Sequence, residues 1–135
     1  MFSISREFSF CYGHRLLGHP GKCGHPHGHN GRTLVTLTEL ELNADGMVRD
    51  FTELKATIGH WIDENLDHKM ILSVEDPLTP LLQELGEPVF LTDANPTAES
   101  LAKLLFDVTA KEGFPVVRVE FWETPKCSAV YKKVS

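Results

Sequence analysis

The chain has 135 residues, of which 41% are hydrophobic and 24% charged, a composition that predicts one globular domain over residues 1–135 and speaks against disorder. Its net charge of −6 speaks against nucleic acid as a partner, because no basic stripe is present to neutralise phosphates. No apolar run reaches the roughly 20 residues that cross a bilayer, and three cysteines without a signal-peptide pattern indicate reduced thiols in the cytoplasm, away from membranes.

The first predicted element is a strand that begins at Phe2 and ends near His14. Its apolar side chains share one parity, which is the pattern of a strand with one buried face: Phe2, Ile4, Phe8 and Phe10. His14 has the same parity, so its imidazole is predicted to point inward. Positions 16–31 contain five Gly and two Pro and are predicted to form a loop.

A second strand is predicted from about Arg32 to Leu42, where Thr, Val and Leu alternate with polar residues. Asp50 resembles a helix cap, and apolar residues recur behind it at helical spacing as far as Ile62. A second helix is predicted to open at Asn95-Pro96, with Pro96 at the first helical position, and to end at Gly113.

Two further strands are predicted over positions 117–122 and 127–133, whereas positions 69–92 have no clear pattern. The order strand–strand–helix–helix–strand–strand predicts the α+β class, with helices on one face of an antiparallel sheet. Cys11 and Cys127 have apolar or strand neighbours and are predicted to be buried and inert.

Three histidines carry the strongest functional signal. His27 and His29 are two residues apart, which on an extended strand places both imidazoles on one side, roughly 6.6 Å apart. His14 could supply a third ligand to the same ion. Three neutral imidazoles with a free fourth position are typical of catalytic zinc, since structural zinc normally takes four protein ligands. His19 and His25 lie among Gly and Pro and are not expected to bind the metal.

Cys23 lies four residues before His27, and its sequence position leaves three interpretations open. It could be a fourth zinc ligand that closes a structural site. It could instead be a free thiolate, stabilised by the nearby dication and acting as a base. The third interpretation is an inert thiol.

Two acidic positions complete the candidate site. Asp67 directly precedes His68, an arrangement that can support a proton relay, although a cationic residue at a helix end would give the same pattern. Glu123 continues the apolar parity of the strand before it, so it is predicted to point inward unless the strand end curls to solvent. A carboxylate there could bind the amine and ring N–H of an amidine-like heterocycle with two hydrogen bonds.

With these residues assembled, the chain resembles the 6-pyruvoyl-tetrahydropterin synthase / 6-carboxytetrahydropterin synthase family over nearly its whole length. The most specific element is Cys23-Gly24-His25-Pro26-His27-Gly28-His29, which fits the family's Cys-x-x-x-His-Gly-His motif. Other segments fall in the expected order: Phe8 to Leu16, Val48-Arg49-Asp50-Phe51, Leu66-Asp67-His68, Asn95-Pro96-Thr97-Ala98-Glu99 and Trp122-Glu123-Thr124. Tyr12 departs from the family pattern, in which small residues commonly precede the first histidine, and is expected to reshape the pocket.

The resemblance implies a tunnelling fold (T-fold), with a four-stranded antiparallel sheet and two helices on one face. It also implies a homo-hexamer, a dimer of trimers, with active sites at subunit interfaces. The implied roles are one Zn²⁺ per subunit on His14, His27 and His29, a proton acceptor at Cys23, a relay of His68 and Asp67, and pterin contacts from Glu123 and Thr97.

The substrate implied by the resemblance is 7,8-dihydroneopterin triphosphate. One branch of the family expels triphosphate and stops at a 6-pyruvoyl product. The other, a lyase of queuosine biosynthesis, also breaks a side-chain carbon–carbon bond and yields 6-carboxy-5,6,7,8-tetrahydropterin and acetaldehyde. The short chain and Trp122-Glu123-Thr124 look more like the second branch, which is the expected activity. The 6-pyruvoyl synthase is the alternative, and a non-catalytic structural zinc module is a more remote one.

Overall fold

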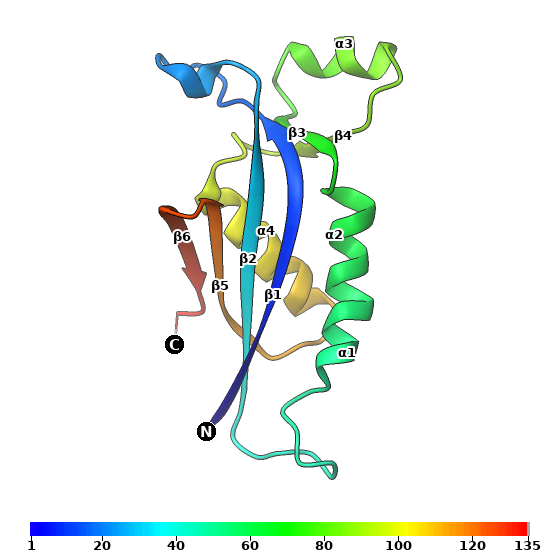
Figure 1. Cartoon of the computed structure of the whole chain (residues 1–135), viewed down its shortest axis with the longest axis vertical. Helices are drawn as coiled ribbons and strands as arrows, with labels where there is room; N and C mark the ends of the chain where they lie inside the picture. The colour runs from blue at the N-terminus through cyan, green and yellow to red at the C-terminus, as the bar shows by residue number, and fades with distance from the viewer. Residues whose placement is uncertain (135) are drawn as a thin grey trace.

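The computed structural model describes residues 1–134, which form one six-stranded sheet in the order β4-β3-β1-β2-β5-β6 (Figure 1). The strands are β1 (Phe2–His14), β2 (His27–Glu39), β3 (Lys69–Ser73), β4 (Val89–Thr92), β5 (Val116–Thr124) and β6 (Cys127–Lys132). The helices are α1 (Phe51–Leu54), α2 (His60–Asn65), α3 (Leu78–Glu84) and α4 (Ala98–Lys111). A π-helical turn, η2 (Lys55–Gly59), joins α1 to α2, and a 3₁₀ turn, η1 (Lys22–Gly24), lies between β1 and β2.

The two longest strands, β1 and β2, form an antiparallel ribbon that runs from the pair Phe2–Glu39 to the pair His14–His27. The predicted first strand is confirmed, and His14 is buried on its inner face. The second strand begins at His27, five residues before the predicted start. Gly28 and Gly31, which suggested a loop, belong to the strand, and a Cβ on Gly31 would lie only 2.9 Å from the rings of Tyr12 and Phe121.

The prediction of four antiparallel strands is wrong, because positions 69–92 add two strands to the sheet. β3 pairs with β1, and β4 with β3, in parallel, whereas the other three pairings are antiparallel. β3 and β4 have five and four residues and are separated by α3, which was also missed. Strands this short hold too few side chains to display a periodicity that distinguishes them from loop or helix.

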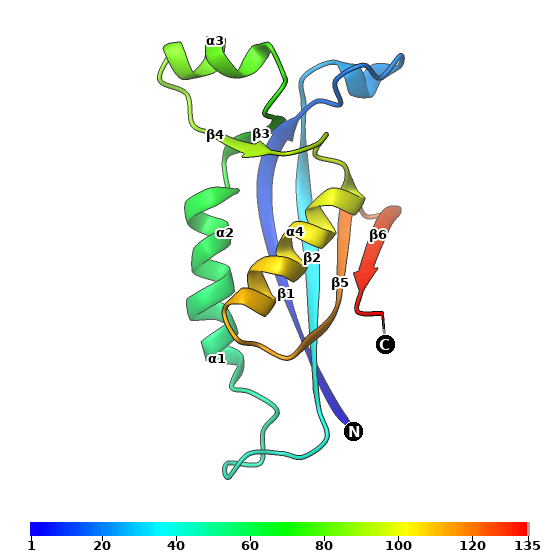
Figure 2. The ribbon, with the colours of Figure 1, turned by 180° about the vertical axis from the view of Figure 1, so that it is seen from behind.

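Both predicted helices are present and pack into one hydrophobic core with the sheet. Figure 2 shows α4 lying across the strands, with α1 and α2 beside β1. The buried helical side chains of this core are Leu54, Ile58, Ile62, Leu101 and Leu105. The Asp50 carboxylate caps α1 by accepting a hydrogen bond from Thr52 N–H at 2.9 Å. Pro96 does not take the first helical position, since Thr97 is the N-cap of α4.

An ion pair fixes the end of β1 beside the turn before α3. The Arg15 guanidinium donates two hydrogen bonds to the carboxylate of Asp76, which is only 2% exposed, and the bond from Nε measures 2.8 Å. One Asp76 oxygen also accepts a hydrogen bond from Leu78 N–H at 2.8 Å. Because Arg15 directly follows His14, this contact helps to position the histidine at the end of β1.

Replacing Asp76 with asparagine is expected to lower the free energy of unfolding by about 3 kcal/mol, since the substitution breaks a largely buried ion pair. The hydrogen bond from Arg15 holds the pKa of Asp76 below its ordinary value in the folded chain. The pair therefore stabilises the fold above the unfolded-state pKa, and this contribution is lost as pH falls through the folded-state pKa. Urea denaturation should show that the difference in free energy of unfolding between wild type and Asp76→Asn becomes smaller as the pH is lowered. Asp107→Asn, which breaks an exposed pair with Lys103, is the control, and an equal loss in both variants would contradict the prediction.

Candidate metal centre and catalytic residues

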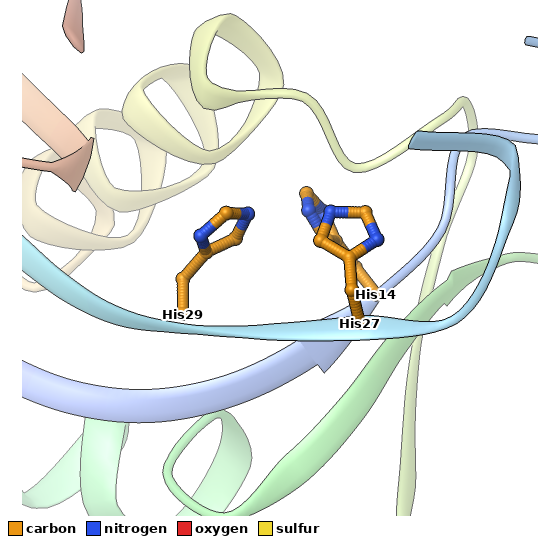
Figure 3. Close-up of side chains that lie close together, drawn as sticks. All are labelled: His14, His27 and His29. Carbon is orange, nitrogen blue, oxygen red and sulfur yellow. The ribbon is translucent and has the colours of Figure 1, made fainter. Parts of the chain in front are cut away.

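His14, His27 and His29 come together at the paired ends of β1 and β2, and we call this group the histidine triad. Their ring centroids are 4.6 Å apart for His14 and His27, 5.1 Å for His14 and His29, and 5.0 Å for His27 and His29. One ring nitrogen from each lies within 4.8 Å of the others, so the three can hold one metal ion. Figure 3 shows all three rings on the same side of the ribbon. Strand pleating puts His27 and His29, two residues apart on β2, on one face, and His14 on β1 is paired directly with His27.

Backbone carbonyl groups orient two of the three rings. The Nδ1 atom of His14 lies 2.8 Å from the Pro96 carbonyl oxygen, and Nδ1 of His27 lies 2.6 Å from that of His25. Each carbonyl accepts a hydrogen bond from Nδ1–H, which leaves the Nε2 lone pair free, and this is the usual outer support of a metal-bound histidine. The Nε2 atoms of His14 and His29 are buried and have no hydrogen-bond partner within residues 1–134. A bound metal ion would satisfy these otherwise unpaired atoms.

The surroundings of His14 and His29 keep these two imidazoles in the neutral form that binds metals. Burial lowers the pKa of His14 to about 4, despite the hydrogen bond to Pro96. Burial also lowers the pKa of His29, with a smaller opposite effect from Glu123 and a further decrease from His27. Both imidazoles are therefore uncharged at neutral pH, with their lone pairs available.

The predicted site residues nearest the triad differ in how closely they approach it. Glu123, at the end of β5, places Oε2 3.9 Å from Nε2 of His29, so its side chain reaches the inner face of the sheet. Cys23 lies in η1, is half-buried and free, and does not belong to the metal-binding group of the triad. The Thr97 hydroxyl accepts a hydrogen bond from Ser100 N–H at 3.1 Å and caps α4.

Asp67 and His68 are paired but lie on the opposite face of the ribbon. The His68 Nδ1 atom is 2.9 Å from an Asp67 carboxylate oxygen. His68 N–H donates to the carbonyl oxygen of Cys11 at 2.7 Å, and the His68 ring reaches within 4.8 Å of the Cys11 thiol. Cys11 has the opposite parity to His14 on β1 and is exposed, which corrects the prediction of a buried thiol; Cys127 is exposed as well.

A cavity of about 750 Å³ adjoins this part of the ribbon. Its volume lies within the range of small-molecule sites. Three of the candidate site residues line it, His27, His29 and His68, together with Cys11. The other candidate site residues do not line it: His14, Cys23, Asp67, Thr97 and Glu123. One chain therefore does not gather all the predicted catalytic residues around this cavity.

Tyr12 packs directly against the triad and has an unusual environment. Its ring centroid is 5.2 Å from that of His14 and 5.7 Å from that of His29, and the residue is 3% exposed. Its hydroxyl has no hydrogen-bond partner within residues 1–134. Burial, with a smaller contribution from Glu123, raises the pKa of the phenol. The inward parity of position 12 on β1 is the sequence signal for this placement.

Replacing Tyr12 with phenylalanine is expected to raise the free energy of unfolding by about 1 kcal/mol in metal-free protein. The variant removes a buried hydroxyl without a partner and keeps the ring that fills the space over Gly31. Chemical denaturation measures the change, and Tyr131→Phe, at a half-exposed ring on β6, is the matched control. A lower stability for the Tyr12 variant would mean that the hydroxyl has a partner in solution.

Comparison with known proteins gives a consistent result. The sequence matches the family model described as 6-pyruvoyl tetrahydropterin synthase over residues 3–134. It is 32% identical to the 6-carboxy-5,6,7,8-tetrahydropterin synthase of Rickettsia bellii, covering 94% of this chain and 97% of that protein. The enzyme of the same name from Haemophilus influenzae is 34% identical, with 98% and 100% coverage.

Solved structures agree with the sequence comparisons. An uncharacterized protein from Wolinella succinogenes superimposes with a TM-score of 0.83 at 32% identity, covering 98% of both chains. The 6-pyruvoyl tetrahydropterin synthase of Caenorhabditis elegans gives a TM-score of 0.73 at 26% identity, covering 98% of this chain and 96% of that one. Within residues 1–134, no helix has the length and apolar character that a membrane span requires.

Proposed function

The chain belongs to the 6-pyruvoyl tetrahydropterin synthase family, and on this basis we propose that it converts 7,8-dihydroneopterin triphosphate and water into 6-carboxy-5,6,7,8-tetrahydropterin, acetaldehyde and triphosphate. The observation that carries the proposal is the histidine triad, whose ligand nitrogens lie within 4.8 Å of one another and include the buried, unpartnered Nε2 atoms of His14 and His29. The names of the relatives favour the 6-carboxy product over the 6-pyruvoyl one. The three free cysteines are consistent with a cytoplasmic enzyme.

Zinc is the metal that we assign to the triad. Its preferred ligands include neutral imidazoles, and three protein ligands leave a coordination position open, as catalytic zinc sites require. When bound, zinc acts as a Lewis acid on the substrate's side-chain hydroxyls and makes the adjacent carbon-bound proton more acidic. Only the triad and its supporting carbonyls are needed to hold the ion, so Cys23 stays available for chemistry.

Cys23 is the proposed base. Its thiolate removes the carbon-bound proton, a role that requires a free sulfur close to the metal but not bound to it. The thiol is free and half-buried in the η1 turn, which connects the strands that carry the triad. Figure 1 shows this turn projecting beyond the ends of β1 and β2.

Glu123 is the proposed anchor of the pterin ring. Its carboxylate can accept hydrogen bonds from the ring N–H and the exocyclic amine of the pterin, in the bidentate geometry that a carboxylate offers to guanidinium groups. The Glu123 carboxylate lies 3.9 Å from the His29 ring. A pterin bound to it would therefore have its substituent chain beside the triad. Thr97 lies at the start of α4, next to the Pro96 carbonyl that orients His14, and is proposed as a second ring contact.

Asp67 and His68 are the proposed proton relay, supplied to each triad by a second copy of the chain. Their position on the opposite face of the ribbon supports this assignment, since a pair on that face is turned away from its own triad. The sheet also ends in two edge strands, β4 and β6, where Leu91 and Val130 are exposed. Unpaired edges with exposed apolar side chains favour pairing with other subunits. A homo-hexamer built from two trimers is the assembly that we propose.

Product analysis by mass spectrometry tests the proposed reaction on zinc-loaded protein with dihydroneopterin triphosphate. We expect carboxytetrahydropterin and acetaldehyde in equal amounts. The pyruvoyl product alone would assign the chain to the other activity of the family, with the same site residues. No turnover by a zinc-loaded oligomer would overturn the proposal and favour a structural role for the metal.

A further inference from the structure

We propose that Cys11, Asp67 and His68 form a second site for a divalent cation of the zinc class, on the face of the sheet opposite the histidine triad. The Cys11 thiol, an Asp67 carboxylate oxygen and a His68 ring nitrogen lie within 4.8 Å of one another. Cys11 belongs to β1, and the other two residues belong to the connection between α2 and β3. This cluster shares no side chain with the triad.

The backbone holds the cluster together before any ion binds. Cys11 N–H donates to an Asp67 carboxylate oxygen at 3.1 Å, and His68 N–H donates to the Cys11 carbonyl oxygen at 2.7 Å. His68 has a φ of +59°, and it is the one residue other than glycine with positive φ within residues 1–134. Such a conformation costs energy in a non-glycine residue and is concentrated at functional sites. Here it directs the imidazole toward β1.

The donor atoms suit zinc and related thiophilic ions. Thiolate, imidazole and carboxylate bind zinc at about 2.3, 2.0 and 2.1 Å, so donors on a tetrahedral ion lie roughly 3.3 to 3.6 Å apart. Because its donors already lie within 4.8 Å of one another, a small rotation of the side chains brings the cluster to this geometry. The exposed side chains of Cys11 and His68 leave room for that rotation. The Asn30 side-chain oxygen lies 3.1 Å from the Cys11 sulfur and can supply a fourth donor.

Two side chains of opposite charge lie beside the cluster. Lys69 and Glu87 line the same cavity as Cys11 and His68. Binding converts the Cys11 thiol to a thiolate and releases its proton, so the site gains negative charge as the cation enters. The combination of a soft thiolate with imidazole and carboxylate donors favours zinc over magnesium or calcium, which prefer oxygen ligands alone.

Occupation of this second site has a consequence for catalysis that rests on the proposed function. A cation bound to Asp67 and His68 removes both from proton transfer, so binding at the cluster and relay activity exclude each other. Zinc beyond one equivalent per chain should therefore inhibit turnover. Replacing Cys11 with serine should weaken this inhibition at least tenfold in zinc concentration, measured relative to the variant's own activity.

Cobalt absorption tests the binding without reference to activity. A cysteine thiolate bound to cobalt(II) gives a charge-transfer band in the near ultraviolet, whereas three histidines give none. Wild-type protein with two equivalents of cobalt should show the band, and Cys11→Ser should lose it while binding one equivalent in equilibrium dialysis. His27→Ala, which damages the triad, should keep the band, as should Cys23→Ser and Cys127→Ser.

Three results would overturn the second site: no band in the wild type, a band that survives Cys11→Ser, or a band lost in Cys23→Ser. The last result would instead place the Cys23 thiolate on the metal of the triad. Circular dichroism of Cys11→Ser confirms that its fold is intact. Because the spectrum needs no substrate, an inactive enzyme would disprove the proposed function and leave the second site to be judged on binding alone.

Discussion

Replacement of Cys23 by alanine is expected to reduce turnover of dihydroneopterin triphosphate by a factor of about 10²–10⁴ and to leave the bound zinc in place. The loss follows from removal of the proposed base. Zinc is retained because the three histidines hold the ion without the thiol, which lies outside the triad's metal-binding group. Turnover and zinc content are measured on the same dialysed sample, so that loss of activity can be compared with loss of metal.

Cys127→Ala is the matched control for this prediction, since Cys127 is also a free thiol but lies exposed on β6. It should retain both activity and zinc. If Cys23→Ala lost zinc in proportion to activity, the thiol would be a ligand. The metal would then have a structural role, as in the zinc module considered from the sequence.

Mixed oligomers of two inactive variants are expected to regain activity. Cys23→Ala and His68→Ala should each be inactive alone, because each removes one partner of the proposed proton transfer. Since His68 lies on the face opposite the triad, the two residues are proposed to meet across a subunit interface. Random mixing of the two variants then leaves about a quarter of the sites with both residues intact, as independent choice of two subunits requires.

Co-expression of the two variants with different affinity tags yields the mixed oligomers for this measurement. Oligomers that combine either variant with wild-type chains serve as controls. They show how much activity remains when an inactive variant replaces part of the wild-type chains. Purified mixtures without any activity would mean that Cys23 and His68 act within one subunit, and the shared active site would be rejected.

The part of the site that local pattern determines could be predicted from the sequence. The alternating side chains of β1 place His14 inward, and the spacing of His27 and His29 places both rings on one face of β2. Of the two hydrogen bonds that orient the rings, only one comes from a sequence neighbour and could be predicted in this way. His25, which supports His27, is a sequence neighbour, whereas Pro96, which supports His14, is 82 residues away and is brought there by the start of α4.

The rest depended on contacts that no local pattern records. β3 joins the sheet through three paired positions with β1 and then pairs with β4, so its place is set by neighbours distant in sequence. That pairing carries Asp67 and His68 to the face opposite the triad, next to Cys11. The sequence predicted the Asp–His pair but not its face, and the thiol that it meets was wrongly predicted to be buried.

X-ray absorption at the zinc edge would test the histidine triad most directly. The sample is the Cys11→Ser variant loaded with one equivalent of zinc, so that the second site does not contribute. We expect three imidazole nitrogens at about 2.0 Å, at least one further light-atom ligand and no sulfur. A sulfur ligand at about 2.3 Å would contradict the open catalytic site and establish a closed metal centre that includes a cysteine.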